Sequence, residues 1–186
     1  MKNNIIIIIS VLFSVFSLNA QTYVQGNGVL PFRSIANTSV LTDANRLNVN
    51  VAFQKYNEYG LNVSNRTNPS QLVGEYYFQN NLLIQLVSRN RNKSEEELNF
   101  EELVDYYREM FTQNIYENEV YFVGEIITKN NFKGFIYYDK RDTYINFLIR
   151  DNAEKYNVMG AITFKPNNLT NARAFFDSFI NSITFK

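Results

Sequence analysis

The sequence predicts an α+β protein in which an antiparallel β-sheet, mostly a meander, is flanked by helices. Two amphipathic helical patterns occur, one mid-chain and one near the C-terminus, with a series of apolar strand patterns between them. The turns between these strands are short, and a parallel crossover would need a dozen or more residues, so neighbouring strands must be antiparallel. A chain of 186 residues with 16% aromatic side chains can bury such a core as one domain.

The N-terminus predicts export. Residues 1–20 begin with a short polar segment carrying one lysine, continue with the apolar run Ile5–Phe16, and end on the small residue Ala20. The apolar run is shorter than the ~20 residues that span a bilayer. We therefore expect a signal peptide at residues 1–20 and an exported, periplasmic or extracellular product that is soluble and does not insert into a membrane. An extended lead-in over residues 21–45 and one α+β domain over residues 46–186 complete the expected organisation.

The first part of this domain is predicted to consist of strands. Apolar residues alternate with polar ones at Leu47, Val49, Val51 and Phe53. Two apolar runs follow, at residues 72–78 and 82–89, separated by Gln79-Asn80-Asn81. Asparagine tolerates positive φ, so this spacing predicts a tight hairpin.

A capped helix is expected next. Ser94 and Asn99 each begin a capping-box pattern with an acidic residue three positions later. Apolar residues then recur with helical spacing at Phe100, Leu103, Val104, Tyr107 and Phe111. The acidic residues at the helix start suit the positive end of its dipole.

A four-strand meander and a closing helix complete the predicted domain. The strands are expected at residues 119–129, 132–139, 143–150 and 155–164. The second helix begins near Thr170 and has one apolar face, formed by Ala172, Phe175, Phe176, Phe179 and Ile180. Residues 182–186 are expected to be extended.

The composition argues against most catalytic machinery. The chain has no cysteine, histidine or tryptophan, which excludes a Ser-His-Asp triad, a thiol nucleophile and His/Cys metal sites. The acidic residues Glu95, Glu96, Glu97, Glu101 and Glu102 are explained by the helix start. We therefore expect no enzyme and no catalytic, cofactor-binding or metal-binding residues. An exported chain without cysteine also fits a bacterial setting better than a disulfide-dependent secreted one.

The charges argue against nucleic acid as a partner. Lys plus Arg equals Asp plus Glu, 18 of each, so no net field favours nucleic acid or an anionic membrane. The candidate interaction surface comprises the tyrosine doublets Tyr76-Tyr77 and Tyr137-Tyr138 and the basic residues Arg89, Arg91 and Lys93. Adjacent strand residues point to opposite faces, so each doublet gives one tyrosine to each face. If one face of the sheet is open, these tyrosines would form an exposed aromatic platform; if helices cover both faces, they would be core residues. The basic residues either bind an acidic partner or belong to a solvated loop.

The order of elements resembles the PsbP-like family, which includes the extrinsic photosystem subunit P and a Ran-binding protein of the same fold. The likeness lies in the helix sequence at residues 100–107, Phe-Glu-Glu-Leu-Val-Asp-Tyr-Tyr, and in the ending at residues 175–185, Phe-Phe-Asp-Ser-Phe-Ile-Asn-Ser-Ile-Thr-Phe. It covers roughly Leu47 to Lys186. The resemblance implies an α/β/α sandwich and a non-catalytic, interaction-type role, and it supplies no site residue.

Three functions follow from these observations. The leading hypothesis is a monomeric binding or accessory module that acts on another envelope or extracellular protein. The alternative is a carrier of a small apolar or lipid-like ligand held between a helix and the sheet, which requires a pocket of some hundreds of Å³. A carboxylate-based hydrolase is the third, and it requires two convergent carboxylates in a cleft.

Overall fold

A computed structural model gives the fold, and it describes residues 23–24, 28–59, 72–91, 99–113 and 122–186. The predicted signal peptide at residues 1–20 lies outside the described residues. Within the described ranges, no helix is both long and apolar enough to cross a membrane.

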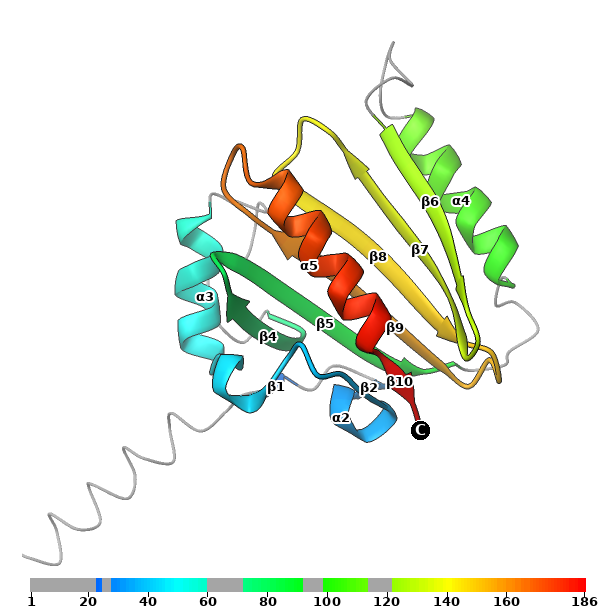
Figure 1. Cartoon of the computed structure of the whole chain (residues 1–186), viewed down its shortest axis with the longest axis horizontal. Helices are drawn as coiled ribbons and strands as arrows, with labels where there is room; N and C mark the ends of the chain where they lie inside the picture. The colour runs from blue at the N-terminus through cyan, green and yellow to red at the C-terminus, as the bar shows by residue number, and fades with distance from the viewer. Residues whose placement is uncertain (1–22, 25–27, 60–71, 92–98, 114–121) are drawn as a thin grey trace, which may run out of the picture.

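Eight of the described strands form one antiparallel sheet with the order β1-β4-β5-β9-β8-β7-β6, in which β2 also pairs with β5 (Figure 1). Its strands are β1 (Tyr23–Val24), β2 (Val29–Leu30), β4 (Gly74–Gln79), β5 (Leu82–Asn90), β6 (Phe122–Lys129), β7 (Phe132–Asp139), β8 (Tyr144–Asp151) and β9 (Tyr156–Thr163). The predicted meander is confirmed as β6–β9, and β9 pairs with β5 to join the meander to the β4–β5 hairpin. Asn80 and Asn81 both have positive φ, 52° and 59°, as the hairpin prediction required.

Helices pack on both faces of this sheet, which confirms the α+β class. Helix α5 (Leu169–Ser182) covers one face, where it packs against even-numbered residues of β5 such as Ile84. Helices α3 (Val49–Glu58) and α4 (Phe100–Gln113) pack on the opposite face, α3 against Leu83 of β5 and α4 against Phe135 and Leu148. Side chains alternate between faces along a strand, so neighbouring residues enter different clusters.

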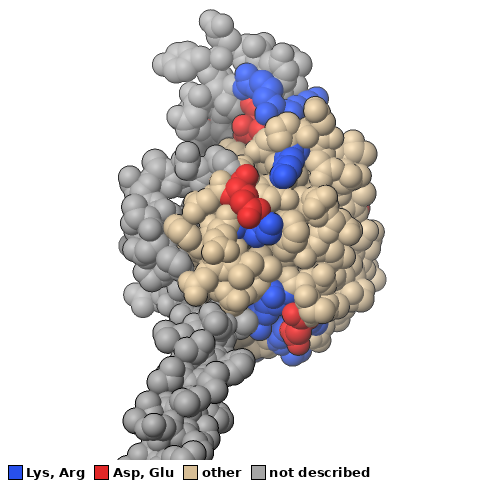
Figure 2. Space-filling view, turned by 90° about the vertical axis from the view of Figure 1, so that its left-hand side faces the viewer, with Lys and Arg blue, Asp and Glu red and all other residues tan. Residues whose placement is uncertain are grey.

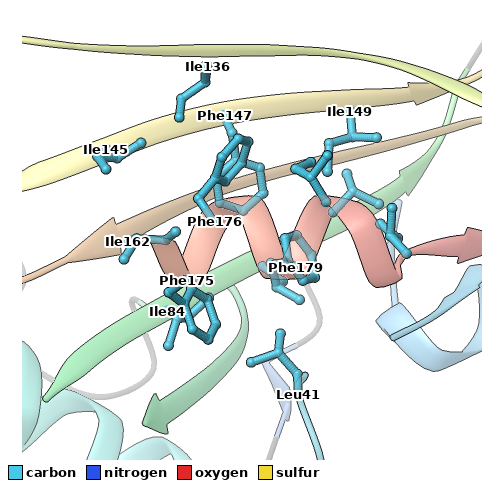
Figure 3. Packing of buried hydrophobic residues seen from close by; sticks show 14 of the residues in the cluster. Leu41, Ile84, Ile136, Ile145, Phe147, Ile149, Ile162, Phe175, Phe176 and Phe179 are labelled. Atoms are coloured by element: carbon cyan, nitrogen blue, oxygen red, sulfur yellow. The ribbon is translucent and has the colours of Figure 1, made fainter. Parts of the chain in front are cut away.

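The main core lies between α5 and the sheet (Figure 3). The predicted apolar face of α5 is confirmed, since Ala172, Phe175, Phe176, Phe179 and Ile180 are all buried. The ring of Phe147 on β8 lies 5.4 Å from the ring of Phe176 and 5.8 Å from that of Phe179, centroid to centroid. The three rings therefore fix α5 over the centre of the sheet.

The strand predicted at Leu47, Val49, Val51 and Phe53 is wrong, because Val49–Glu58 forms α3. Asn48 caps this helix, since its side chain accepts a hydrogen bond from the Val51 N–H at 3.0 Å. Val49, Ala52, Phe53 and Tyr56 have the i, i+3, i+4, i+7 spacing of a helical stripe, and they pack together against the sheet. The helical stripe, rather than the alternation, is therefore the pattern that the packing on the sheet uses.

Residues 28–45 pack into the domain, which differs from the extended lead-in expected there. They contain α2 (Phe32–Ile35), β3 (Ala36–Asn37) and the 3₁₀ helix η1 (Asp43–Asn45), and β3 pairs with the C-terminal strand β10 (Thr184–Phe185). Phe32 and Leu41 are completely buried. The buried carboxylate of Glu75 on β4 accepts a hydrogen bond from the Phe32 N–H at 3.0 Å and forms an ion pair with Arg46. This segment is therefore part of the core.

Candidate functional site

On the sheet face opposite α5, the strand register places side chains in three rows that cross β5, β9, β8 and β7. The basic row contains Arg89, Asn157, Arg150 and Lys133. The apolar row contains Val87, Met159, Leu148 and Phe135. The amide row contains Gln85, Ala161, Asn146 and Tyr137. Along the strand direction, the side chains on this face therefore change from basic to apolar to amide-containing.

A groove of about 320 Å³ lies on this face. Val87, Leu148 and Met159 of the apolar row line it, and all three belong to central strands of the sheet. Tyr107 of α4 borders the groove on one side and Val73, just before β4, borders it on the other. Helix α3 packs over β4 and β5, and helix α4 packs over β7 and β8. The groove lies between these two helices, over β9 and the neighbouring parts of β5 and β8.

Stacked aromatic rings form the α4 side of the groove. The Tyr107 ring stacks on the Tyr137 ring at 5.1 Å between centroids, and Tyr137 stacks on Phe135 at 5.2 Å. Burial raises the pKa of Tyr107 and of Tyr137, so both hydroxyls stay protonated at neutral pH. This wall is thus flat, apolar and uncharged.

The position of α4 is fixed at its N-terminus by the second of the two predicted capping boxes. The Glu102 N–H donates to the Asn99 side-chain oxygen at 2.9 Å, and the Asn99 N–H donates to the Glu102 carboxylate at 2.9 Å. Phe100 and Val104 on the inner face of the helix are buried against the sheet. The sequence prediction of a capped helix at this site is confirmed, and it places Tyr107 beside the groove.

Amide groups add hydrogen-bonding capacity to the groove. The Gln85 side chain donates from Nε2 to the Val73 carbonyl oxygen at 2.9 Å, which holds its amide in place. Asn146 also lines the groove, and its side chain makes no hydrogen bond to any described residue. An occupant of the groove can therefore accept or donate hydrogen bonds at the amide row.

The basic row lies at one end of the groove. Arg89 is exposed, and it is the one charged residue among those that line the groove in the described part of the chain. Arg150 is 3% exposed and donates from Nε to the Asn157 side-chain oxygen at 2.9 Å. Lys133 forms an ion pair with Glu101 of α4, whose pKa this ammonium lowers.

The structure separates the tyrosines of the predicted interaction surface. Tyr76 is buried in the α3 cluster, whereas Tyr77 is buried in the α5 core with its hydroxyl donating to Glu75 at 3.3 Å. Tyr138 also lies in the α5 core, where the Arg173 guanidinium sits 5.8 Å from its ring centroid. Tyr137 borders the groove. The four tyrosines therefore do not form one exposed platform.

The basic residues of that predicted surface are also separated. Arg89 lines the groove, as described above. Arg91 forms an ion pair with Glu154, and Lys93 lies outside the described residues. On the face shown in Figure 2, positive and negative side chains lie in small neighbouring groups, with no broad area of one sign among the coloured residues.

Sequence reasoning missed the groove residues on β8 and β9 and, apart from Arg89, those on β5. The clearest signal was a polar side chain inside an otherwise apolar strand, namely Gln85 in Leu82–Val87 and Asn146 in Tyr144–Ile149. Ala161 is a small residue at a central position of the sheet. All three side chains are half-buried, which fits a part of the sheet face that no described helix fully covers.

Comparisons with known proteins and a search for metal clusters were both negative. A scan against protein-family models finds no matching family, and a search of curated proteins finds no matching sequence. Among the residues whose positions the structure gives, no group of three or more acidic side chains is arranged to hold a metal ion.

Proposed function

We propose that this protein is an exported, non-catalytic binding protein of the bacterial envelope that carries a small amphipathic molecule in the groove. The observation that carries the proposal is the groove itself. Its volume of about 320 Å³ falls within the range of small-molecule sites, at the low end. It combines an apolar floor with a few polar groups at its edges, which is the usual composition of such a site.

The groove chemistry favours binding over catalysis. The described residues that line it include no carboxylate, and the chain has no histidine or cysteine. The two tyrosines at its wall have raised pKa values, so neither supplies a base near neutral pH. The groove can therefore position a molecule, but it offers no group suited to move a proton.

A protein partner is the second candidate function. Helices on both sheet faces are what the PsbP-like resemblance implies, and that family's implied role is interaction with proteins. Tyr106 of α4 and Ile126 of β6 are 53% and 48% exposed, and both could contact a partner. Two exposed side chains make a smaller feature than the groove, so we rank this function second.

Binding of N-phenyl-1-naphthylamine, a neutral fluorescent probe, tests the carrier function. Ala161 faces the groove, so Ala161→Phe fills it without entering the α5 core. We expect the purified protein to bind the probe and Ala161→Phe to bind at least tenfold more weakly. Ala153→Phe, in the exposed turn between β8 and β9, is the matched control and should bind like wild type. Equal binding by wild type and Ala161→Phe, with both folded by circular dichroism, would contradict the proposal.

A further inference from the structure

We propose that the molecule in the groove is an amphipathic monoanion, a fatty or aromatic acid, whose acid group binds Arg89. This inference rests on the carrier function and names its ligand class. Arg89 lines the groove at one end, whereas the residues that line the rest of it are apolar, amide or phenol side chains. One end of the site is therefore suited to a negative charge and the remainder to an uncharged body.

The Arg89 guanidinium is available for a ligand. Its side chain is exposed and makes no ion pair or hydrogen bond with the described part of the chain. Asn157 and Arg150 follow it in the basic row, one and two strands away, which is about 5 and 10 Å at the usual strand spacing. Arg150 is buried and its Nε donates to the Asn157 side-chain oxygen at 2.9 Å, whereas Arg89 is an exposed cation at the groove.

The order of the rows sets how such a molecule lies. Along a strand, residues two positions apart are separated by about 7 Å, so the apolar row is about 7 Å and the amide row about 14 Å from the basic row. An acid group at Arg89 would place its apolar body over Val87 and Met159. The far end would reach Gln85 of the amide row. An elongated acid fits this order, whereas a compact polar anion would leave the apolar row unoccupied.

The same residues disfavour other ligand classes. A cation would find no carboxylate among the lining residues whose positions the structure gives, and Arg89 would repel it. A phosphate-rich ligand would require several cations or a glycine-rich turn of backbone N–H groups, and the described part of the lining supplies one cation. A single negative charge on the ligand matches Arg89, the one charged side chain that the described residues contribute to the groove.

A matched pair of probes tests this ligand class. N-phenyl-1-naphthylamine is neutral, and 8-anilinonaphthalene-1-sulfonate is the same skeleton with one added sulfonate. Each is titrated by fluorescence against wild type, Arg89→Gln, Arg89→Lys and Lys165→Gln, with folding checked by thermal unfolding. Lys165 follows β9 outside the groove, and Lys165→Gln makes the same change in net charge.

We expect Arg89→Gln to weaken sulfonate binding about tenfold, because it removes one charge-assisted hydrogen-bonding group. Binding of the neutral probe should change less than about twofold, and Arg89→Lys should keep most of the sulfonate affinity. Lys165→Gln should change neither. Decanoate and 1-naphthoate, as displacing ligands, distinguish a fatty acid from an aromatic acid, and displacement by either agrees with the proposal.

Equal effects of Arg89→Gln on the two probes, or no effect on the sulfonate, would overturn the anion assignment. The carrier function would survive that result if the neutral probe still bound and Ala161→Phe still blocked it. Failure of the neutral probe to bind wild type would instead remove the carrier function, and the anion assignment with it.

Discussion

Because Gly160 of β9 has no side chain, the ring of Phe147 can pack directly against its backbone. The substitution Gly160→Ala tests this packing. A Cβ at residue 160 would lie 2.4 Å from Phe147 Cζ and 2.4 Å from the Gln85 carbonyl oxygen. Ordinary contacts are about 3.5–4.0 Å, so both neighbours would have to move by about 1 Å. Overpacking of this kind costs about 1–3 kcal/mol, and we take the upper end because the Gln85 oxygen belongs to the backbone.

Part of this cost is offset, because alanine has less conformational freedom than glycine in the unfolded chain. Where there is no clash, this substitution ordinarily stabilises a strand by about 0.5–1 kcal/mol. We therefore expect Gly160→Ala to lower the free energy of unfolding by about 2 kcal/mol in a urea titration followed by circular dichroism. Gly134→Ala on β7 is the matched control, because its new Cβ would have no neighbour closer than 3.7 Å. The control should be neutral or slightly stabilising.

A double-mutant cycle separates the two clashes. Phe147→Leu removes the ring contact but leaves the Gln85 oxygen in place, so in that background Gly160→Ala should cost only about 1 kcal/mol. A Gly160→Ala protein as stable as wild type, or more stable, would refute the packing argument.

Three further predictions concern stability. Glu75→Ala should lower the free energy of unfolding by about 3 kcal/mol in urea, because it leaves Arg46 without its buried ion-pair partner; a loss below 1 kcal/mol would contradict this. Asn99→Ala should cost about 1 kcal/mol and lower the helical signal, since it removes the cap that also orders Glu102; unchanged stability would count against the capping box. Burial raises the pKa of Tyr144 from 10.0 to about 12, so the folded state holds the phenol proton more tightly than the unfolded state does. The free energy of unfolding should therefore fall as the pH rises from 10 to 12. Tyr144→Phe should show a shallower fall when urea unfolding is measured across this pH range, and equal slopes would exclude the effect.

The elements that the sequence predicted correctly are those with strong local signals. The Asn80-Asn81 turn, the Asn99 cap and the aromatic face of α5 each depend on residues close together in the chain. Local conformational preference and tertiary packing agree at these positions.

The errors occur where contacts distant in sequence decide the structure. Val49–Glu58 is amphipathic with either period over a few residues, and its packing on β4 and β5 selects the helix. Phe32 belongs to no periodic apolar pattern in the sequence. Its backbone is held by Glu75, which lies 43 residues away in the chain, so no local signal predicts its place in the core.

The groove could not be predicted from the sequence because it arises from the pairing of β5 with β9. That pairing brings Val87 next to Met159 and Gln85 next to Ala161, although these residues are far apart in the chain. Arg89 was identified from the sequence as part of a basic loop, whereas the structure places it at the end of β5 beside the groove. The sequence therefore pointed to Arg89 but not to the groove residues that surround it.

Backbone amide shifts measured by NMR during titration with N-phenyl-1-naphthylamine locate the bound molecule directly. The account predicts that the largest shifts map to Val87, Met159 and Ala161, with smaller shifts at Tyr107 and none along α5. A depression of about 430 Å³ lies on the other face of the sheet, beside Leu82 of β5 and Phe175 and Ser178 of α5. Shifts concentrated there, or around Ile126 on the edge strand β6, would contradict the assignment of the groove as the binding site.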